Sequence, residues 1–196
     1  MKKLGILLLG IVFISFISCN ETKKEETVEK TVEEIIDNKT VEVDETPIAL
    51  GIELEGKSGS SSSARIKFLQ EDGLVKMEAR LNGLEPGTHA IHIHEKADCS
   101  ADDATSSGGH WNPTFEPHGK WGDEEGYHRG DIGNFEVGED GTGSISMQTD
   151  EWCLGCDDEK KNIIGKAIIV HQGADDFTSQ PSGDAGARVS CGGIIQ

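Results

Sequence analysis

From residue 47 onward, the chain contains short stretches in which apolar and polar residues alternate. Residues 64–68 (A-R-I-K-F) alternate strictly, and residues 74–81 (L-V-K-M-E-A-R-L) alternate in part. Such alternation is typical of a β-strand with one buried face, because successive side chains of a strand point to opposite faces of the sheet. Residues 163–170 are mostly apolar and include β-branched side chains, which predicts a buried strand. Long helical periodicity is absent from this part of the sequence.

Turn signals separate these stretches. Asp72-Gly73, Asn82-Gly83, Pro86-Gly87 and Asp140-Gly141 are dipeptides that favour tight turns, and the chain contains 25 glycines. Two longer segments, 96–133 and 172–187, carry loop composition, and loops of this length are uncommon unless they serve a function. We therefore predict an all-β domain, a sandwich or a barrel, with two long functional loops.

The N-terminus has the pattern of an export signal. Lys2 and Lys3 precede an apolar run of 14 residues at 4–17, which is too short to span a bilayer comfortably. The run ends at F-I-S-C, which resembles a bacterial lipobox, so residues 1–18 are predicted to be a lipoprotein signal peptide and Cys19 the lipidated residue. A plain secreted protein is the alternative. The prediction places the protein in the cell envelope, anchored to a membrane on its periplasmic or surface face.

The segment that follows, residues 19–46, is predicted to be an acidic tether. Residues 20–46 contain ten acidic residues, four lysines, no aromatic residue and no glycine. Val28, Val32 and Ile35 have helical spacing, which leaves a transient helix as an alternative to a disordered spacer. The folded domain is expected to comprise residues 47–196.

Charge and cysteine content limit the partners and the chemistry. The chain has 36 acidic and 18 basic residues, a balance that argues against a nucleic-acid partner. It has five cysteines, and lipidation of Cys19 would leave an even number in an exported domain, where disulfides persist. Four cysteines allow three pairings, and their spacing does not choose among them.

Six of the seven histidines fall where two adjacent metal ions would need them. His92 and His94 form an H-x-H motif, and in a strand both side chains point to one face. A loop supplies three more histidines and a carboxylate, a donor set that suits a closed tetrahedral zinc site. His171 ends the apolar run and could return to the H-x-H pair. The loop residues are His110, His118, His128 and Asp131.

These segments resemble the copper,zinc superoxide dismutase family. The matching motifs are G-x-H-x-x-H-x-H-E at residues 87–95, G-G-H-x-N-P at 108–113, H-x-G-D at 128–131, V-H-x-x-A-D-D at 170–176 and G-x-A-G-x-R-x-x-C-G at 183–192. They occur in order, and the resemblance covers residues 47–196. It implies a Greek-key barrel or sandwich of about eight antiparallel strands.

The resemblance also implies roles for individual residues. His110 would bridge the two metals as an imidazolate, and Asp175 would accept hydrogen bonds from ligand histidines of both. Arg188 would attract the anionic substrate, and Cys99 and Cys191 would form a disulfide that pins the ligand loop to the barrel. His89 matches a structural histidine. The implied ligands are His92, His94, His110 and His171 for copper, and His110, His118, His128 and Asp131 for zinc.

The implied activity is dismutation of superoxide to dioxygen and hydrogen peroxide, which would protect the cell envelope. Copper would change oxidation state, and His110 would take up and return a proton. The alternative is a non-catalytic module of the same fold that binds or delivers copper. A copper donor protein is a candidate partner, and the sequence leaves open whether the protein is a monomer or a homodimer.

Two features depart from the family pattern. Segment 172–187 has no lysine to steer superoxide, and Lys96 and Lys120 are candidates to compensate. Cys153-Leu154-Gly155-Cys156 is not a family signature. A small structural disulfide is the interpretation we favour, and a redox pair or a copper-handling site are the alternatives.

Overall fold

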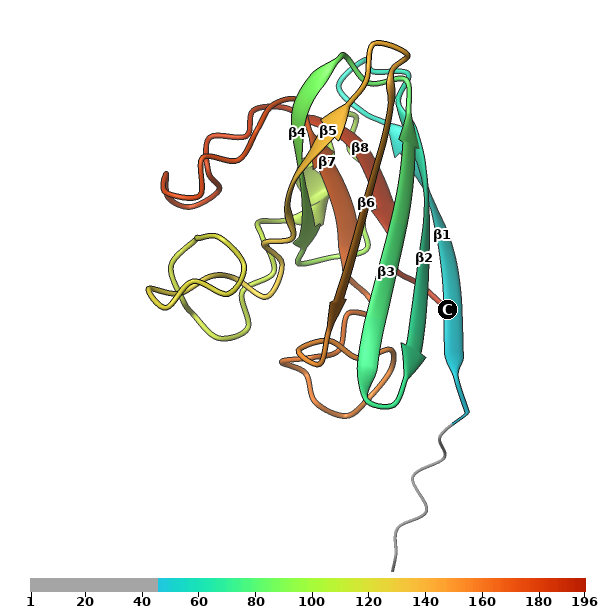
Figure 1. The fold of residues 1–196 in the computed structure, drawn as a ribbon, viewed down its shortest axis with the longest axis vertical. Helices are drawn as coiled ribbons and strands as arrows, with labels where there is room; N and C mark the ends of the chain where they lie inside the picture. The colour runs from blue at the N-terminus through green and yellow to red at the C-terminus, as the bar shows by residue number, and fades with distance from the viewer. Residues whose placement is uncertain (1–45) are drawn as a thin grey trace, which may run out of the picture. The chain divides into compact units, whose positions relative to one another are not determined.

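The computed structural model describes residues 46–196, which form one closed antiparallel barrel (Figure 1). Around the barrel the strands follow the order β1-β2-β3-β6-β5-β4-β7-β8, and β8 pairs with β1 to close it. The predicted all-β class and Greek-key barrel are confirmed. The eight strands are β1 (Ile48–Gly56), β2 (Ser63–Glu71), β3 (Leu74–Asn82), β4 (Gly87–His94), β5 (Gly133–Val137), β6 (Thr142–Thr149), β7 (Ala167–His171) and β8 (Arg188–Gly193).

The alternating stretches form β2 and β3, in which every second side chain is buried except for the half-buried Gln70 near the end of β2. Ile66 of β2 and Met77 of β3 are fully buried in the core of the barrel. Asp72 and Gly73 connect the two strands with φ values of 51° and 76°, the left-handed backbone that a two-residue hairpin turn requires. Period-two patterning and turn chemistry therefore determine this hairpin locally.

The barrel is not a simple meander, because β3 lies beside β6, and β4 lies between β5 and β7. The connection from β6 to β7, residues 150–166, therefore crosses an end of the barrel. Part of the strand predicted at 163–170 belongs to this connection: Gly165 turns the chain with φ 85°, and β7 begins only at Ala167. Ile163 is nevertheless fully buried in the core, which explains its apolar character.

Strand β4 departs from simple alternation because both of its faces are covered. Its last six residues are all buried. Ile91 and Ile93 point into the barrel core, and His92 and His94 occupy the opposite face. Figure 1 shows the two long loops, 95–132 and 172–187, projecting on one side of the barrel. Both loops contribute to the site described below.

Two disulfides cross-link the domain. Cys99, in the first long loop, is bonded to Cys191 of β8, and Cys153 is bonded to Cys156 within the β6–β7 connection. The one helical element of the described part of the chain is a 3₁₀ turn at Thr105–Ser107. In residues 46–196 we find no helix with the length and apolar character needed to cross a membrane. The predicted signal peptide, Cys19 and almost all of the tether lie outside the described residues.

Candidate metal centre

His110 lies at the centre of the six histidines that the sequence singled out. It lies in the first long loop, opposite His94, with which it forms an isolated β-bridge. Its imidazole ring is surrounded by the other five rings within 6 Å, so strands β4 and β7 and the first long loop converge on one point. The distances between ring centroids are 4.0 Å to His92, 5.0 Å to His94, 5.3 Å to His118, 5.7 Å to His128 and 5.9 Å to His171.

The side chains form two groups that share His110. In each group, one potential ligand atom from every residue lies within 4.8 Å of the others, and all the residues are buried. Four imidazoles can serve as ligands to copper, and three imidazoles with a carboxylate suit zinc. The first group is His92, His94, His110 and His171; the second is His110, His118, His128 and Asp131. Both groups have the composition expected from the sequence.

The ring nitrogens provide a test of whether these residues fit metal ions. Buried polar atoms in proteins are nearly always hydrogen-bonded, yet six buried ring nitrogens of this site have no hydrogen-bond partner in the described part of the chain. Each belongs to one of the two groups, and an ion at the centre of each group would satisfy them. These atoms are His92 Nδ1, His94 Nε2, His110 Nε2, His118 Nδ1, His128 Nδ1 and His171 Nε2. The residues therefore fit two metal ions.

In most of these histidines the second ring nitrogen is held by the protein. In the first group, His94 Nδ1 donates to the carbonyl oxygen of Gly108 at 2.9 Å, and His171 Nδ1 donates to that of Gly186 at 3.2 Å. Such bonds fix the tautomer and the orientation of a ligand imidazole. The sequence did not indicate these carbonyl groups, because Gly186 lies 15 residues from its partner and Gly108 lies 14.

Asp175 connects the two groups from the second long loop. Its carboxylate accepts hydrogen bonds from His92 Nε2 and His118 Nε2, both at 2.8 Å. Asn134 of β5 holds the backbone of Asp175 through two hydrogen bonds of 2.8 Å. A side chain at Gly183 would lie 1.7 Å from Asp175 Oδ1, so only glycine fits there. The contacts expected of Asp175 are present, and loop 172–187 fixes their position.

Burial and neighbouring charges set the protonation of the histidines. Burial lowers the pKa of His110 to about 4 and, together with the charge of His92, that of His171 to about 3; burial also lowers the pKa of His94. For His118 burial acts in the same direction, but the carboxylates of Asp131 and Asp175 outweigh it and raise its pKa to about 9. At neutral pH the three lowered imidazoles are therefore neutral, the form in which histidine binds metals.

The carboxylates of the site stay ionised. Burial alone would raise the pKa of Asp131, but the imidazole rings of His110, His118 and His128 beside it hold that pKa well below its usual range. Asp131 Oδ1 lies 2.8 Å from His110 Nδ1, and Oδ2 accepts from the backbone N–H of His128 at 2.9 Å. Asp131 therefore supplies negative charge at the centre of the second group.

Arg188 begins β8 directly opposite His171 in the β7–β8 ladder. Its guanidinium donates to the carbonyl oxygen of Ala104 at 2.8 Å and to Ser107 Oγ at 3.2 Å. Burial lowers the pKa of Arg188. The ordinary pKa of an arginine is so far above neutral pH that the guanidinium nevertheless stays a cation. Sequence reasoning missed Ser107, which is fully buried in the 3₁₀ turn and 81 residues away from its partner.

Two other residues, His89 and Trp111, lie near the groups without joining them. The ring nitrogens of His89 lie 2.8 Å from the carbonyl oxygens of His171 and Glu85, so His89 belongs to the scaffold, as expected. Trp111, next to His110, is buried in the barrel core, and Lys166 lies 5.8 Å from its ring centroid. Lys96 and Lys120 are exposed, and a steering role for them stays a prediction.

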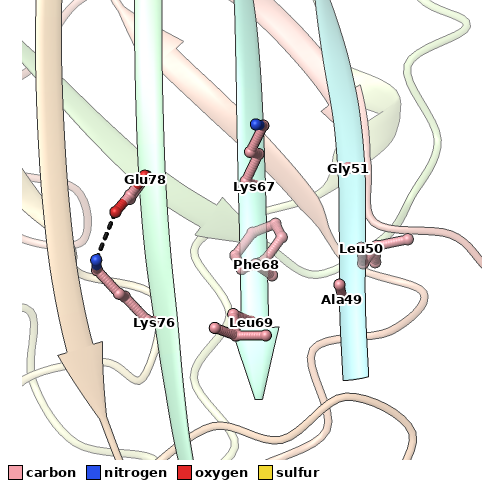
Figure 2. A pocket seen from close by; sticks show the side chains of 8 residues that line it. All are labelled: Ala49, Leu50, Gly51, Lys67, Phe68, Leu69, Lys76 and Glu78. Atoms are coloured by element: carbon pink, nitrogen blue, oxygen red, sulfur yellow. Dashed lines mark ion pairs between the residues drawn. The ribbon is translucent and has the colours of Figure 1, made fainter. Parts of the chain in front are cut away.

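A groove of about 450 Å³ lies on the outer surface of the barrel, and none of its lining residues belongs to the histidine groups. Figure 2 shows its lining, including the ion pair between Lys76 and Glu78, whose charged atoms are 2.5 Å apart. It is formed by β1, β2 and β3, which contribute no residue to either metal group. Its lining residues are Ala49, Leu50, Gly51, Lys67, Phe68, Leu69, Lys76 and Glu78.

Comparison with known proteins agrees with this site. Residues 62–194 match the family model described as copper/zinc superoxide dismutase. The superoxide dismutase-like protein YojM of Bacillus subtilis is 30% identical over 195 residues, which cover 97% of this chain and 95% of that protein. A copper-zinc superoxide dismutase of Mesembryanthemum crystallinum is 36% identical over 134 residues, covering 65% of this chain and 83% of the relative.

A solved structure shares the fold. The crystal structure of a superoxide dismutase-like protein from Bacillus subtilis superposes with a TM-score of 0.66 and 34% identity, and the match covers 74% of this chain and 97% of that one. A double mutant of the same protein gives a TM-score of 0.66 with 36% identity. The matched segment, the barrel and the two histidine groups together show that this chain belongs to the copper/zinc superoxide dismutase family.

Proposed function

We propose that the protein is an enzyme that converts two superoxide anions and two protons into dioxygen and hydrogen peroxide. One observation carries the proposal: the four imidazoles of the first group, the shared His110 and the cation Arg188 occur together in one site. A module that only stores copper needs the ligands but has no use for an arginine beside them. Some relatives are named superoxide dismutase-like rather than superoxide dismutase, so turnover has to be measured directly.

In the proposed site, His92, His94, His110 and His171 hold copper, and His110, His118, His128 and Asp131 hold zinc. Copper supplies one-electron oxidation and reduction when bound, and zinc, which has no redox chemistry, shapes the site. Asp175 fixes the rings of His92 and His118, and through them the relative position of the two groups. The tilted rings of His92 and His110, 4.0 Å apart, keep the first group compact.

Two residues act on the substrate and the proton in this proposal. Arg188 attracts superoxide, and the hydrogen bonds to Ala104 and Ser107 hold its guanidinium in place. His110 faces both groups, and its lowered pKa favours the neutral ring, so that a ring that has taken up an extra proton gives it up readily. Its Nε2, which has no hydrogen-bond partner among residues 46–196, is the atom that can carry a proton to the reduced product.

Pulse radiolysis of the protein loaded with copper and zinc tests the proposal. We expect superoxide to decay catalytically, with a rate proportional to protein concentration. A protein that binds one copper and one zinc but leaves superoxide decay at the uncatalysed rate would contradict the proposal. That outcome would support the alternative of a copper-binding or copper-delivery module.

The net charge of the domain makes Arg188 the subject of a second prediction. From residue 47 onward there are 26 acidic and 12 basic residues, so distant charges repel superoxide, but salt screens them beyond about 8–10 Å. Local positive charge must then dominate, and loop 172–187 contributes no lysine. We expect Arg188→Ala to lower the rate of dismutation roughly 10- to 100-fold.

Metal content controls for indirect effects of the Arg188→Ala substitution, because both metals should remain bound. Arg188→Lys should keep part of the rate, since a point charge still attracts the anion without the guanidinium's planar set of donors. Pulse radiolysis at several ionic strengths measures both effects. An unchanged rate in fully metallated Arg188→Ala would show that another group steers the substrate.

We also propose that the enzyme is attached to a membrane of the cell envelope through a lipid on Cys19. The lipobox-like F-I-S-C sequence and the acidic segment after it support this attachment. Cys19→Ser should move the protein from the membrane fraction to the soluble fraction without a change in specific activity, because the tether separates the anchor from the domain. Continued membrane attachment of the variant would exclude the lipid. A copper donor protein stays a candidate partner.

A further inference from the structure

The connection between β6 and β7 is orange in Figure 1. It contacts the first long loop, 95–132, at the two residues that flank His128. Because this loop supplies the members of the second group, it is called the zinc-binding loop below. Glu151 accepts hydrogen bonds from the hydroxyl of Tyr127 at 3.0 Å and 2.9 Å and forms an ion pair with Arg129. The side chains of this ion pair are 22% and 27% exposed, so solvent screens it less than a pair on the open surface. One carboxylate therefore holds the chain on both sides of His128.

The neighbouring residue strengthens this contact. Trp152 is 1% exposed, and its indole N–H donates to the carbonyl oxygen of Arg129 at 2.9 Å. Trp121 of the zinc-binding loop packs edge-on against Trp152, with 5.5 Å between centroids, and lies 5.1 Å from the ring of Tyr127. Glu151 and Trp152 thus form a polar and aromatic clamp on residues 127–129.

His128 needs such support more than the other zinc-group histidines do. His118 is held by Asp175 through its ring and by Gln180 through its backbone, and His110 donates to Asp131. Within residues 46–196, by contrast, no hydrogen bond reaches Nε2 of His128, and its Nδ1 lies 3.2 Å from Asp131 without hydrogen-bond geometry. The backbone N–H of His128 donates to Asp131 Oδ2 at 2.9 Å. The main chain at residues 127–129, and not a partner of the ring, therefore sets the position of the ring.

We propose that Glu151 is a positioning residue for the zinc site: it holds His128 in place through Tyr127 and Arg129. The inference rests on the proposed function, in which His128 is a zinc ligand. Groups that orient a metal ligand affect metal affinity although they never touch the ion. Glu151 lies 20 residues beyond Asp131 and in a different loop, so no motif indicates this role.

The small disulfide acquires a role in this arrangement. Cys153–Cys156 closes the turn that directly follows Glu151 and Trp152. Asn162 braces the same turn, because its side chain accepts from the N–H of Gly155 at 3.1 Å and donates to the carbonyl oxygen of Cys156 at 3.0 Å. Gln70 of β2 accepts from the N–H of Leu154 at 2.6 Å. The clamp is therefore built on a rigid turn fastened to the barrel.

Zinc release from the metal-loaded protein tests the proposal. The comparison uses wild type, Glu151→Gln and the control Glu124→Gln, an exposed glutamate of the zinc-binding loop changed in the same way. Glu151→Gln keeps the shape of the side chain and removes the charge that pairs with Arg129. We expect zinc transfer to a colorimetric chelator to become roughly tenfold faster in Glu151→Gln and to stay unchanged in the control.

A spectroscopic measurement separates positioning from general stabilisation. With Co²⁺ in the zinc site, the visible absorption bands report the ligand geometry, and they should shift in Glu151→Gln but not in Glu124→Gln. If zinc release and the Co²⁺ spectrum match wild type while only the melting temperature of the metal-free protein falls, the proposal is wrong. Tyr127→Phe, which removes one hydroxyl group, should give a smaller change in the same direction and serves if Glu151→Gln does not fold.

The outcomes also separate this inference from the proposed function. A wild-type protein that binds no zinc would contradict the zinc site itself, and with it both proposals. A wild-type protein that binds zinc and dismutates superoxide, paired with a Glu151→Gln variant that releases zinc at the wild-type rate, would contradict the role of Glu151 alone.

Discussion

His171→Ala should abolish dismutation and leave zinc bound. His171 belongs to the first histidine group only, and it is the one ligand that strand β7 supplies. Its removal leaves three imidazoles for copper and opens a gap beside Arg188, its partner in the β7–β8 ladder. Within residues 46–196, none of the hydrogen bonds that hold His118, His128 and Asp131 involves the side chain of His171. We expect a rate at least about 100-fold below wild type, beyond the effect of removing a supporting group.

Asp131→Ala should have the complementary effect on metal content. Asp131 lies in the second group only and collects the backbone N–H groups of Gly119 and His128 as well as the ring of His110. Its loss removes the negative charge of that group, so zinc should be lost first. Elemental analysis of both purified variants gives the result directly. Equal loss of copper and zinc in each variant would show that the two groups do not bind metals independently.

The sequence predicted the parts of this molecule that depend on local pattern. Strict alternation at residues 64–68 and the Asp72-Gly73 turn indicated the β2–β3 hairpin, because side-chain direction and turn geometry are properties of a few adjacent residues. The H-x-H pair followed from the same rule. In β4 the alternation runs between isoleucine and histidine, so one face belongs to the core and the other to the site.

The members of the two histidine groups were predicted from the family resemblance, which rests on the motifs and their order. The structure brings all of these members together. The spacing of the four cysteines alone allowed three pairings, but the family resemblance implied Cys99 with Cys191, and the structure has this disulfide. Contacts outside the family motifs could not be predicted in this way. Ser107 and Glu151 have no local signal, because their partners lie 81 and 24 residues away.

The two disulfides should differ strongly in their contribution to stability. Cys99–Cys191 spans 92 residues and ties the ligand loop to β8, whereas Cys153–Cys156 spans three. In the loop-entropy model, closure of the long loop stabilises the folded state by about 4–5 kcal/mol and closure of the short one by about 2 kcal/mol. Cys191→Ser should therefore lower the free energy of unfolding of the metal-free protein more than Cys156→Ser does, as measured by denaturant titration.

Cys99→Ser serves as the control for the chemistry of the substitution. Cys191 is 2% exposed in an apolar cluster with Ala104, Ala167 and Ile169, so a serine there also buries a hydroxyl group, whereas Cys99 is only partly buried. An unpaired buried hydroxyl costs about 1–3 kcal/mol, so Cys191→Ser should exceed Cys99→Ser by that amount at most, and both should exceed Cys156→Ser. If Cys156→Ser destabilises the protein most, loop length does not decide how much a disulfide contributes to stability. In that case the turn that follows Glu151 and Trp152 contributes more to the stability of the fold than the cross-link between the first long loop and β8 does.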